Sequence, residues 1–361
     1  MTVAYSYNPD YAVPPGDTLR EALDEQCMTQ DELASRTGLS RKTINEILQG
    51  KSPITAPTAA RLELATGVPG SMWNSLERNY QERVATLRQR EEIARDVQWW
   101  RQFPYAQLTK LRAVPATPDK FKRAQELLRF FAVSGRHAWE QIWTASPQAM
   151  FRRATCAHDK TFVTASWLRI VQLQAMELPC DKYCPEKFGQ ALEQIRGLTT
   201  LEPAKFVPKI KELCGTAGVA FSLVPELRGM AVSGAALWHA DRPIVALCLR
   251  GKANDKFWFT FFHESMHILH HGKKQVFLDT RGDSDSQSTA LEKEANERAS
   301  RLLIPAKYID RLRCLRTVAQ VKELARELKL HEGIVVGQHQ YMVGNYKKWN
   351  HLKMKLVWDG P

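Results

Sequence analysis

Four histidines and one glutamate fall within residues 262–271, FHESMHILHH. In a helix, residues four apart lie on one face, about one turn from each other. His263 and His267 have this spacing, so their two imidazole nitrogens can reach one metal ion. Glu264 would lie at the edge of the same face. A carboxylate in that place can take a proton from an attacking water and deliver it to a leaving amine. The spacing therefore predicts a catalytic metal site.

This order of residues is the HExxH pattern of zinc peptidases. His267 and His271 are also four apart, but an apolar residue follows His267, so that pair lacks an adjacent base. His271 would also lie about 12 Å along the helix axis from His263, too far to share its ion. We therefore expect His263 and His267 as metal ligands and Glu264 as the catalytic carboxylate. His270 and His271 are expected at the helix end, where they cap carbonyls or line the cleft.

A third protein ligand is needed, and the downstream segment STALEKEANERASRLLIP has apolar residues at helical spacing. Glu292 and Glu294 are both candidates. Glu292 shares a face with Asn296, so one can bind the metal while the other orients a ligand histidine. Glu294 would place Arg298 there instead, which is unfavourable beside a cation. We therefore expect Glu292 as the ligand and Asn296 as its supporting residue, with Glu294 and Glu297 on a solvated face.

The sequence around the motif predicts a helix, a small sheet and then the motif helix. PAKFVPKIKELCGTAG is typical of a helix, and VAFSLVPEL, GMAVSGAALWH and RPIVALCLRG of three short strands. KFWFTFFHESMHILHHGKK is typical of the motif helix, closed by Gly272. Its aromatic residues would bury the helix, and buried imidazoles need a partner. Two histidines and a carboxylate favour Zn2+, although Mn2+ fits the same ligands.

The other end of the chain predicts a helix-turn-helix. Within residues 28–50, MTQDELASRTGLSRKTINEILQG, Thr29 is a good N-cap and Glu32 completes a capping box. Gly38 stands where a helix must end in a left-handed residue, and Ser40 is the next N-cap. Apolar residues at helical spacing follow on both sides of this turn. Two short helices about a tight glycine turn form a helix-turn-helix.

The second helix of this hairpin would expose polar residues near its N-terminus, where a recognition helix presents side chains to the major groove. Arginine or lysine can pair with guanine, asparagine with adenine, and serine or threonine with phosphate. The alternative is a helical hairpin with a solvated polar face. The candidate DNA contacts are Ser40, Arg41, Lys42, Thr43 and Asn45.

The stretch from PPGDTLREAL through LSRKTINEILQGKSPIT to GSMWNSLERNY resembles the XRE-type helix-turn-helix of HigA-like antitoxins and repressors. The resemblance covers about 80 residues. It implies a five-helix domain that dimerises on palindromic operator DNA, with Arg41, Lys42 and Asn45 facing the DNA. It also implies a toxin as a further candidate partner. Residues 1–90 hold 10 Lys and Arg against 11 Asp and Glu, so we expect modest affinity without dimerisation.

HESMHILHHG followed by LEKEANERASRLLIP resembles the ImmA/IrrE metallo-endopeptidases, whose pattern is HExxH and then a helix that contains a glutamate and ends in LLxP. Counted back from the proline, the ligand glutamate falls on Glu292. LARELKLHEGIVVGQHQ resembles the C-terminal segment of that family, and the match spans roughly residues 200–345. Arg298 departs from the pattern, where an apolar residue is common. The resemblance implies a zincin-like peptidase that cleaves a helix-turn-helix repressor.

Length, charge and composition limit where the protein is located and how its domains are organised. The chain has 361 residues, a net charge of +12 and seven scattered cysteines, and no apolar run approaches the ~20 residues that span a membrane. Without a signal-peptide pattern, these features predict a cytoplasmic protein with no membrane contact. We expect a mostly α, multi-domain chain: an all-α helix-turn-helix domain at 1–90, a helical middle region at 91–200, and an α+β metallopeptidase domain at 201–361.

Two functions are consistent with this organisation. The first is an enzyme: a DNA-binding regulator whose zinc-dependent endopeptidase cuts a repressor, in its own chain or another, within a stress, mobile-element or toxin–antitoxin circuit. The second is a transcriptional autoregulator without proteolysis, in which the metal domain is a sensor or scaffold. The intact set His263, Glu264, His267 and Glu292 favours the first.

Overall fold

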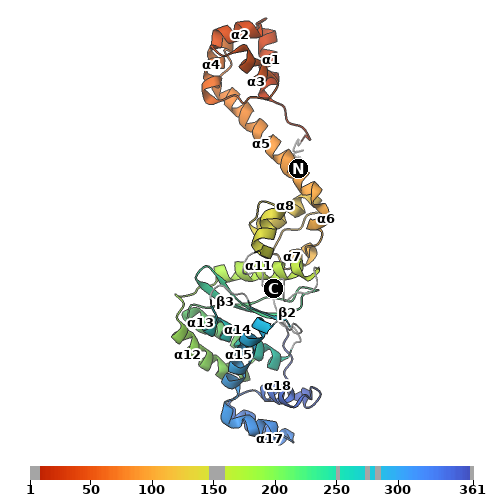
Figure 1. Cartoon of the computed structure of the whole chain (residues 1–361), viewed down its shortest axis with the longest axis vertical. Coiled ribbons are helices and arrows are strands. Elements are labelled where there is room, and N and C mark those ends of the chain that lie inside the picture. The colour runs from red at the N-terminus through yellow and green to blue at the C-terminus, as the bar shows by residue number, and fades with distance from the viewer. Residues whose placement is uncertain (1–8, 146–158, 249–252, 273–276, 281–285, 358–361) are drawn as a thin grey trace, which may run out of the picture. The chain divides into compact units, whose positions relative to one another are not determined.

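The computed structural model describes residues 9–145, 159–248, 253–272, 277–280 and 286–357. Two compact units make up the chain, Met1–Val97 and Gln98–Pro361 (Figure 1). The finer division at residues 90 and 200 stays a prediction. Within the described residues no helix is long and apolar enough to cross a membrane.

The first unit consists of helices around one apolar core. Trp73 is fully buried at its centre, together with Leu33 and Ile44 from the predicted hairpin. The 26-residue helix α5 begins in this core and continues beyond it as a helix rich in charged residues. The helices are α1 (Pro15–Glu25), α2 (Gln30–Thr37), α3 (Arg41–Leu48), α4 (Ala56–Thr66) and α5 (Gly70–Arg95).

The turn between α2 and α3 forms as the cap residues predict, with one difference. The Thr29 hydroxyl accepts the backbone N–H of Glu32, Gly38 is left-handed at φ 64°, and Ser40 caps α3. The capping box is only half formed, because the Glu32 carboxylate binds Arg36 one turn later. A charge-assisted pair at this spacing competes with the neutral backbone N–H for the same oxygens.

The second unit begins with short helices around an aromatic cluster. The rings of Trp99, Phe103, Trp139 and Phe162 lie with centroids 4.9–5.6 Å apart. Both tryptophans are buried, so the cluster is the core of this part of the unit. The elements here are α6 (Val97–Trp100), α7 (Tyr105–Lys110), α8 (Lys120–Phe131), α9 (Arg136–Glu140), η1 (Gln141–Ala145) and α11 (Asp159–Glu177).

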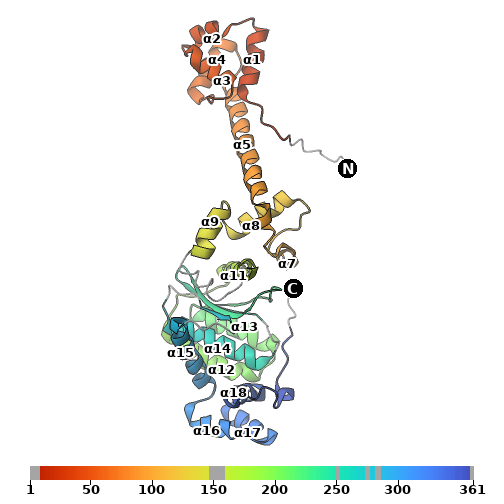
Figure 2. The same cartoon turned by 45° about the vertical axis from the view of Figure 1, so that its right-hand side comes forward.

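A four-stranded sheet forms the middle of the second unit, in the order β1-β3-β2-β4. Strands β1 and β3 are parallel and the other pairs are antiparallel. Helix α11 covers one face, while α13 and α14 (Asn254–His270) cover the other (Figure 2). The sequence predicts three of these strands and misses β4. The strands are β1 (Ala220–Leu223), β2 (Val232–His239), β3 (Arg242–Leu247) and β4 (Phe277–Thr280), preceded by α12 (Pro185–Arg196), η3 (Gly197–Thr200) and α13 (Pro203–Thr216).

The C-terminal helices complete the core around α14. Lys353 binds the Asp255 carboxylate at 2.7 Å and the Gln340 side-chain oxygen at 2.7 Å, so the tail closes over the first turn of α14. The mostly helical two-unit architecture with an α+β second unit confirms the predicted fold class. The remaining elements are α15 (Ser286–Leu303), η4 (Ala306–Tyr308), α16 (Ile309–Arg313), α17 (Val318–Leu328), α18 (Glu332–Val343) and η5 (Asn350–Leu352).

Candidate metal centre and DNA-reading surface

Helix α14 carries the HExxH residues through the interior of the second unit. Trp258, Phe261 and Phe262 are fully buried on it and pack against the sheet and α13. A helix that is apolar on most sides is held in place by its burial. The two motif histidines are therefore fixed before any ion binds.

Three candidate ligand atoms converge between α14 and α15. Glu292 lies with its two carboxylate oxygens 3.1 Å from His263 Nε2 and 3.4 Å from His267 Nε2. The two Nε2 atoms are 3.1 Å apart, and all three donors lie within 4.8 Å of one another. Two imidazole nitrogens that face each other at this distance need a proton or a cation between them. Two nitrogens and one carboxylate are a donor set that fits zinc.

The protonation of these groups suits a cation. Burial lowers the pKa of His267 to about 4, so its ring is neutral at pH 7. For Glu292, burial raises the pKa, but hydrogen bonds with His263 and His267 outweigh it and bring the pKa to about 2. A neutral imidazole and an ionised carboxylate are the forms that bind metal.

Glu264 is fully buried beside the first ligand histidine. Strand β2 approaches it at Gly234, where a Cβ atom would lie 3.0 Å from Glu264 Oε1 and 2.5 Å from the Thr260 methyl group. A side chain at position 234 would thus occupy space that the carboxylate uses. The glycine fixes where Glu264 can lie, a constraint that no spacing rule indicates.

In the first unit, α3 exposes the polar residues expected to read DNA. Arg41, Lys42 and Asn45 are exposed. Ser40 and Thr43 instead build the N-cap, with their hydroxyl oxygens 2.8 Å apart. Both hydroxyls remain at the helix N-terminus, where phosphate binds readily. The five candidates therefore lie together on one end of one helix.

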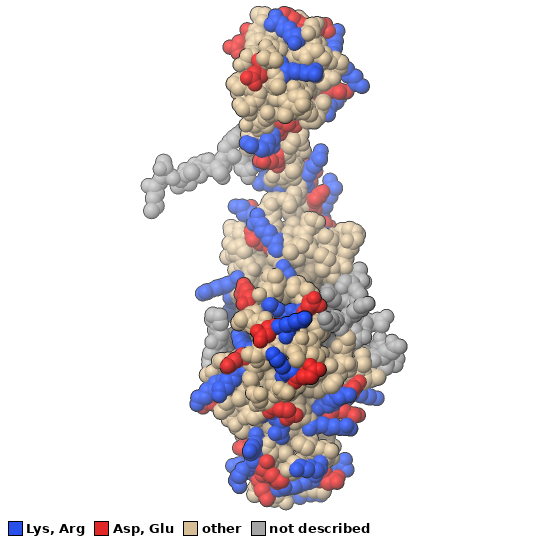
Figure 3. All heavy atoms as spheres, turned by 90° about the vertical axis from the view of Figure 1, so that its left-hand side faces the viewer, with Lys and Arg blue, Asp and Glu red and all other residues tan. Residues whose placement is uncertain are grey.

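Acidic residues accompany the basic residues of this surface. Arg41 forms an ion pair with Asp31 of α2 at 3.2 Å, with both side chains largely exposed. Lys42 lies 3.9 Å from Glu46 on α3. Exposed pairs of this kind are weak, so a phosphate can replace the carboxylate. On the face of the molecule drawn in Figure 3, basic and acidic side chains are interspersed.

Two protein-family models match this chain, one toward each end. The Helix-turn-helix model matches residues 19–73, and the IrrE N-terminal-like domain model of peptidase family M78 matches residues 225–336. The HTH-type transcriptional regulator YddM of Escherichia coli strain K12 is 32% identical over 63 residues, which cover 18% of this chain and 67% of that protein. The chain belongs to the helix-turn-helix transcriptional regulators.

One solved structure is also similar to this regulator. It is the Pseudomonas aeruginosa antitoxin HigA with the higBA promoter, 26% identical, covering 24% of this chain and 87% of that one at a TM-score of 0.21. The family matches confirm the resemblance to both an XRE-type reader and an IrrE-like peptidase domain. The regulator thus carries a metallopeptidase-type domain in its second unit.

One contact of a candidate ligand histidine is not among those that the sequence predicts. Asn296 is half-buried, and among the described residues it makes no hydrogen bond with either ligand histidine. His271 does: its Nδ1 lies 2.7 Å from His267 Nδ1. Glu294 is 40% exposed, consistent with the expected solvated face, and its carboxylate binds Arg298 and lies 3.6 Å from His271. The role of Asn296 stays a prediction.

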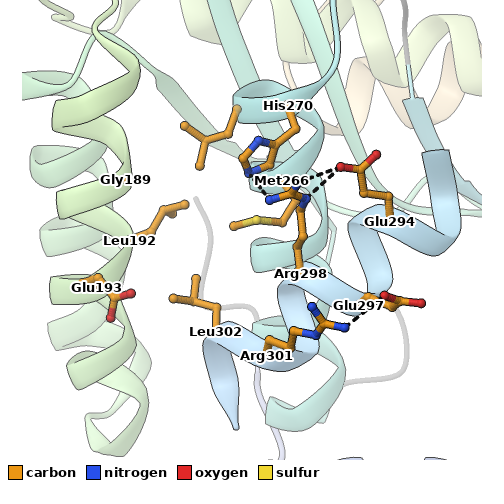
Figure 4. A pocket seen from close by; sticks show the side chains of 11 residues that line it. Gly189, Leu192, Glu193, Met266, His270, Glu294, Glu297, Arg298, Arg301 and Leu302 are labelled. Carbon is orange, nitrogen blue, oxygen red and sulfur yellow. Dashed lines mark hydrogen bonds and ion pairs between the residues drawn. The ribbon is translucent and has the colours of Figure 1, made fainter. Parts of the chain in front are cut away.

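A cavity of about 530 Å³ lies behind the metal centre, between α12, α14 and α15. Leu192, Met266 and Leu302 supply apolar walls, and Arg298 and Arg301 line the α15 side, each paired with a glutamate of α15 (Figure 4). His270 points into this cavity, close to Arg298, rather than toward the ligands. Of the two histidines expected at the helix end, only His271 therefore contacts a ligand histidine.

Proposed function

We propose that this regulator binds DNA through α3 and that its M78 domain is a zinc-dependent endopeptidase that cleaves a regulatory protein. The convergence of His263, His267 and Glu292 beside the buried Glu264 carries the proposal. The match to a peptidase family supports the reaction class.

The chain's own residues account for the chemistry as follows. When bound, a zinc ion would polarise a peptide carbonyl and lower the pKa of water. His263, His267 and Glu292 would hold the ion. Glu264 takes the proton of the attacking water and passes it to the amine that leaves. Its burial strengthens these electrostatic interactions, since little solvent screens them.

Substitution of Glu264 by Gln tests this role. The amide keeps the shape of the side chain but cannot take a proton, so zinc binding should persist while proteolysis is lost. Glu297→Gln is the matched control, because that carboxylate is exposed on α15 and pairs only with Arg301 among the contacts described. Cells carrying each version are compared before and after DNA damage by mapping new protein N-termini. If no cleavage product depends on Glu264, the protein is not a peptidase under these conditions, and the autoregulator without proteolysis replaces it.

The DNA-binding role is tested at α3. The double variant Arg41→Ala/Asn45→Ala should lose binding to the protein's own promoter in a gel shift, because one cation and one base-reading amide are removed. Arg78→Ala removes the same charge from an exposed position on α5 and should bind normally. Equal binding by the double variant and the control would exclude α3 as the recognition helix.

The substrate we propose is a helix-turn-helix repressor, either another protein or the first unit of this chain. Support comes from the presence of a DNA reader and a peptidase-family domain in one polypeptide. With both domains in one polypeptide, cleavage of a repressor would directly change the transcription that the repressor controls. Mapped N-termini that fall within a DNA-binding regulator would support this substrate class, and N-termini elsewhere would oppose it.

A further inference from the structure

His271 contacts the ligand His267 twice. Its backbone N–H donates to the His267 carbonyl at 3.0 Å, and its Nδ1 lies 2.7 Å from His267 Nδ1. Helix α14 ends at His270, and His271 has an extended backbone at φ −113° and ψ 150°. This conformation turns its ring back along the helix. Both rings are buried, so little water competes for this hydrogen bond.

Which nitrogen carries the hydrogen in this contact follows from the surroundings of His267 Nε2, on the other side of the His267 ring. His267 Nε2 faces Glu292 and His263, so in a metal site this nitrogen carries no proton. A neutral imidazole has one N–H, and in His267 it must then be on Nδ1. His267 therefore donates and His271 Nδ1 accepts. The single N–H of His271 is then on its Nε2.

The Glu294 carboxylate lies near that second N–H, at a distance longer than a direct hydrogen bond. Its Oε2 is 3.6 Å from His271 Nε2, and its Oε1 lies 2.8 Å from Arg298. The His267–His271 contact is thus direct, and a carboxylate held by Arg298 lies beside the far nitrogen of His271. Such outer contacts fix the tautomer and direction of a ligand histidine. The ionised Glu294, paired with Arg298, favours the N–H on His271 Nε2.

We propose that His271, through its contact with His267 Nδ1, is the positioning residue that holds His267 Nε2 toward the metal. This inference rests on the proposed metal site and assigns the supporting role to a different residue from Asn296. His271 is not itself a ligand in this arrangement, because it meets the side of the His267 ring opposite to Nε2. Its loss should weaken zinc affinity about 10–100-fold, the usual effect of removing an outer partner.

The test measures zinc affinity of the full chain, stripped of metal, by competition with a chromogenic chelator. His271→Leu fills the space but accepts no hydrogen bond, so affinity should fall about 10–100-fold. His271→Gln offers an oxygen acceptor and should bind more tightly than the Leu variant. His270→Ala is the matched control, since that ring faces the cavity, and should bind as the wild type. Spectra of the Co2+-loaded variants show whether the ligand geometry changes with the affinity.

The outcomes separate this inference from the proposed function. If wild type binds no zinc, or if His267→Ala binds as well as wild type, the metal site itself is wrong. If His267→Ala loses zinc while His271→Leu keeps it, only the positioning role is wrong. Equal losses in His271→Leu and His270→Ala, or no recovery with Gln, would also overturn it. Thermal unfolding of each variant excludes a general loss of structure, and His271→Ala replaces the Leu variant if that one does not fold.

Discussion

On the proposed function, replacement of Gly234 by alanine should impair cleavage while leaving the three proposed metal ligands in place. Gly234 pairs with Leu247 in the centre of the sheet, and its open side faces α14. An added Cβ would lie 2.5 Å from the Thr260 methyl carbon and 3.0 Å from both Cγ and Oε1 of Glu264. Thr260 and Glu264 are both buried, so neither can swing into solvent.

The size of the effect follows from these distances. The Thr260 contact must open by about 1 Å and the Glu264 contacts by a few tenths of an ångström to reach ordinary packing. Overpacking of this kind costs about 1–3 kcal/mol of folding free energy. In a unit of this size we expect the melting temperature to fall by roughly 5 °C. A displaced catalytic carboxylate can lower the rate by about 10²-fold.

The assay combines thermal unfolding, zinc affinity and Glu264-dependent cleavage. Gly189→Ala is the control, because α12 leaves open space around that glycine. Alanine there should raise stability by about 0.5–1 kcal/mol. Gly234→Ala should retain one zinc equivalent and lose cleavage. A variant that melts and cleaves like wild type would refute the close approach of β2 to the carboxylate.

Three further substitutions test how the elements are held. Arg196→Met removes the guanidinium that binds the last carbonyls of α15, and should lower the free energy of unfolding in urea by about 1–3 kcal/mol. Lys353→Met leaves the buried Asp255 unpaired and should cost about 3 kcal/mol. Addition of Asp255→Leu should recover much of that loss. Ser40→Ala removes the α3 cap and should cost about 1 kcal/mol in the melting of the first unit, together with weaker promoter binding in a gel shift.

The sequence predicts the features that depend on local spacing. The turn at Gly38 follows from conformational rules for single residues, and the structure has it. The i, i+4 spacing of His263 and His267 brings their nitrogens within 3.1 Å. Glu292 is harder to predict, because it lies on α15 whereas the two histidines lie on α14. Its position follows from helical periodicity in α15 together with the family pattern.

Features that depend on tertiary contacts are missed. The role of Gly234 requires the position of β2 over α14, which no local pattern specifies. His271 is expected within a helix that continues to Gly272, but the helix ends at His270 and the extended residue turns its ring to His267. Asp31 and Arg41 lie on different helices, so the spacing of residues within one helix does not predict their ion pair.

A second hairpin in the chain shows why turn geometry alone does not identify a DNA reader. Between α17 and α18 a left-handed residue, Lys329 at φ 55°, precedes a buried leucine and the N-cap His331. The α2–α3 turn has a similar order: the left-handed Gly38, the partly buried Leu39 and the N-cap Ser40.

The two hairpins differ in what their second helices present. At the start of α18 a Cβ on Gly333 would lie 2.6 Å from the Asn254 side chain, and one on Gly337 would lie 2.6 Å from Asp255. That face is therefore packed against α14 and cannot enter a groove of DNA. The corresponding face of α3 is exposed and carries Arg41 and Asn45. The proposal that the first unit binds DNA thus rests on the exposure and chemistry of the α3 side chains. The similar turn between α17 and α18 instead positions a helix that packs against α14, which carries the histidines.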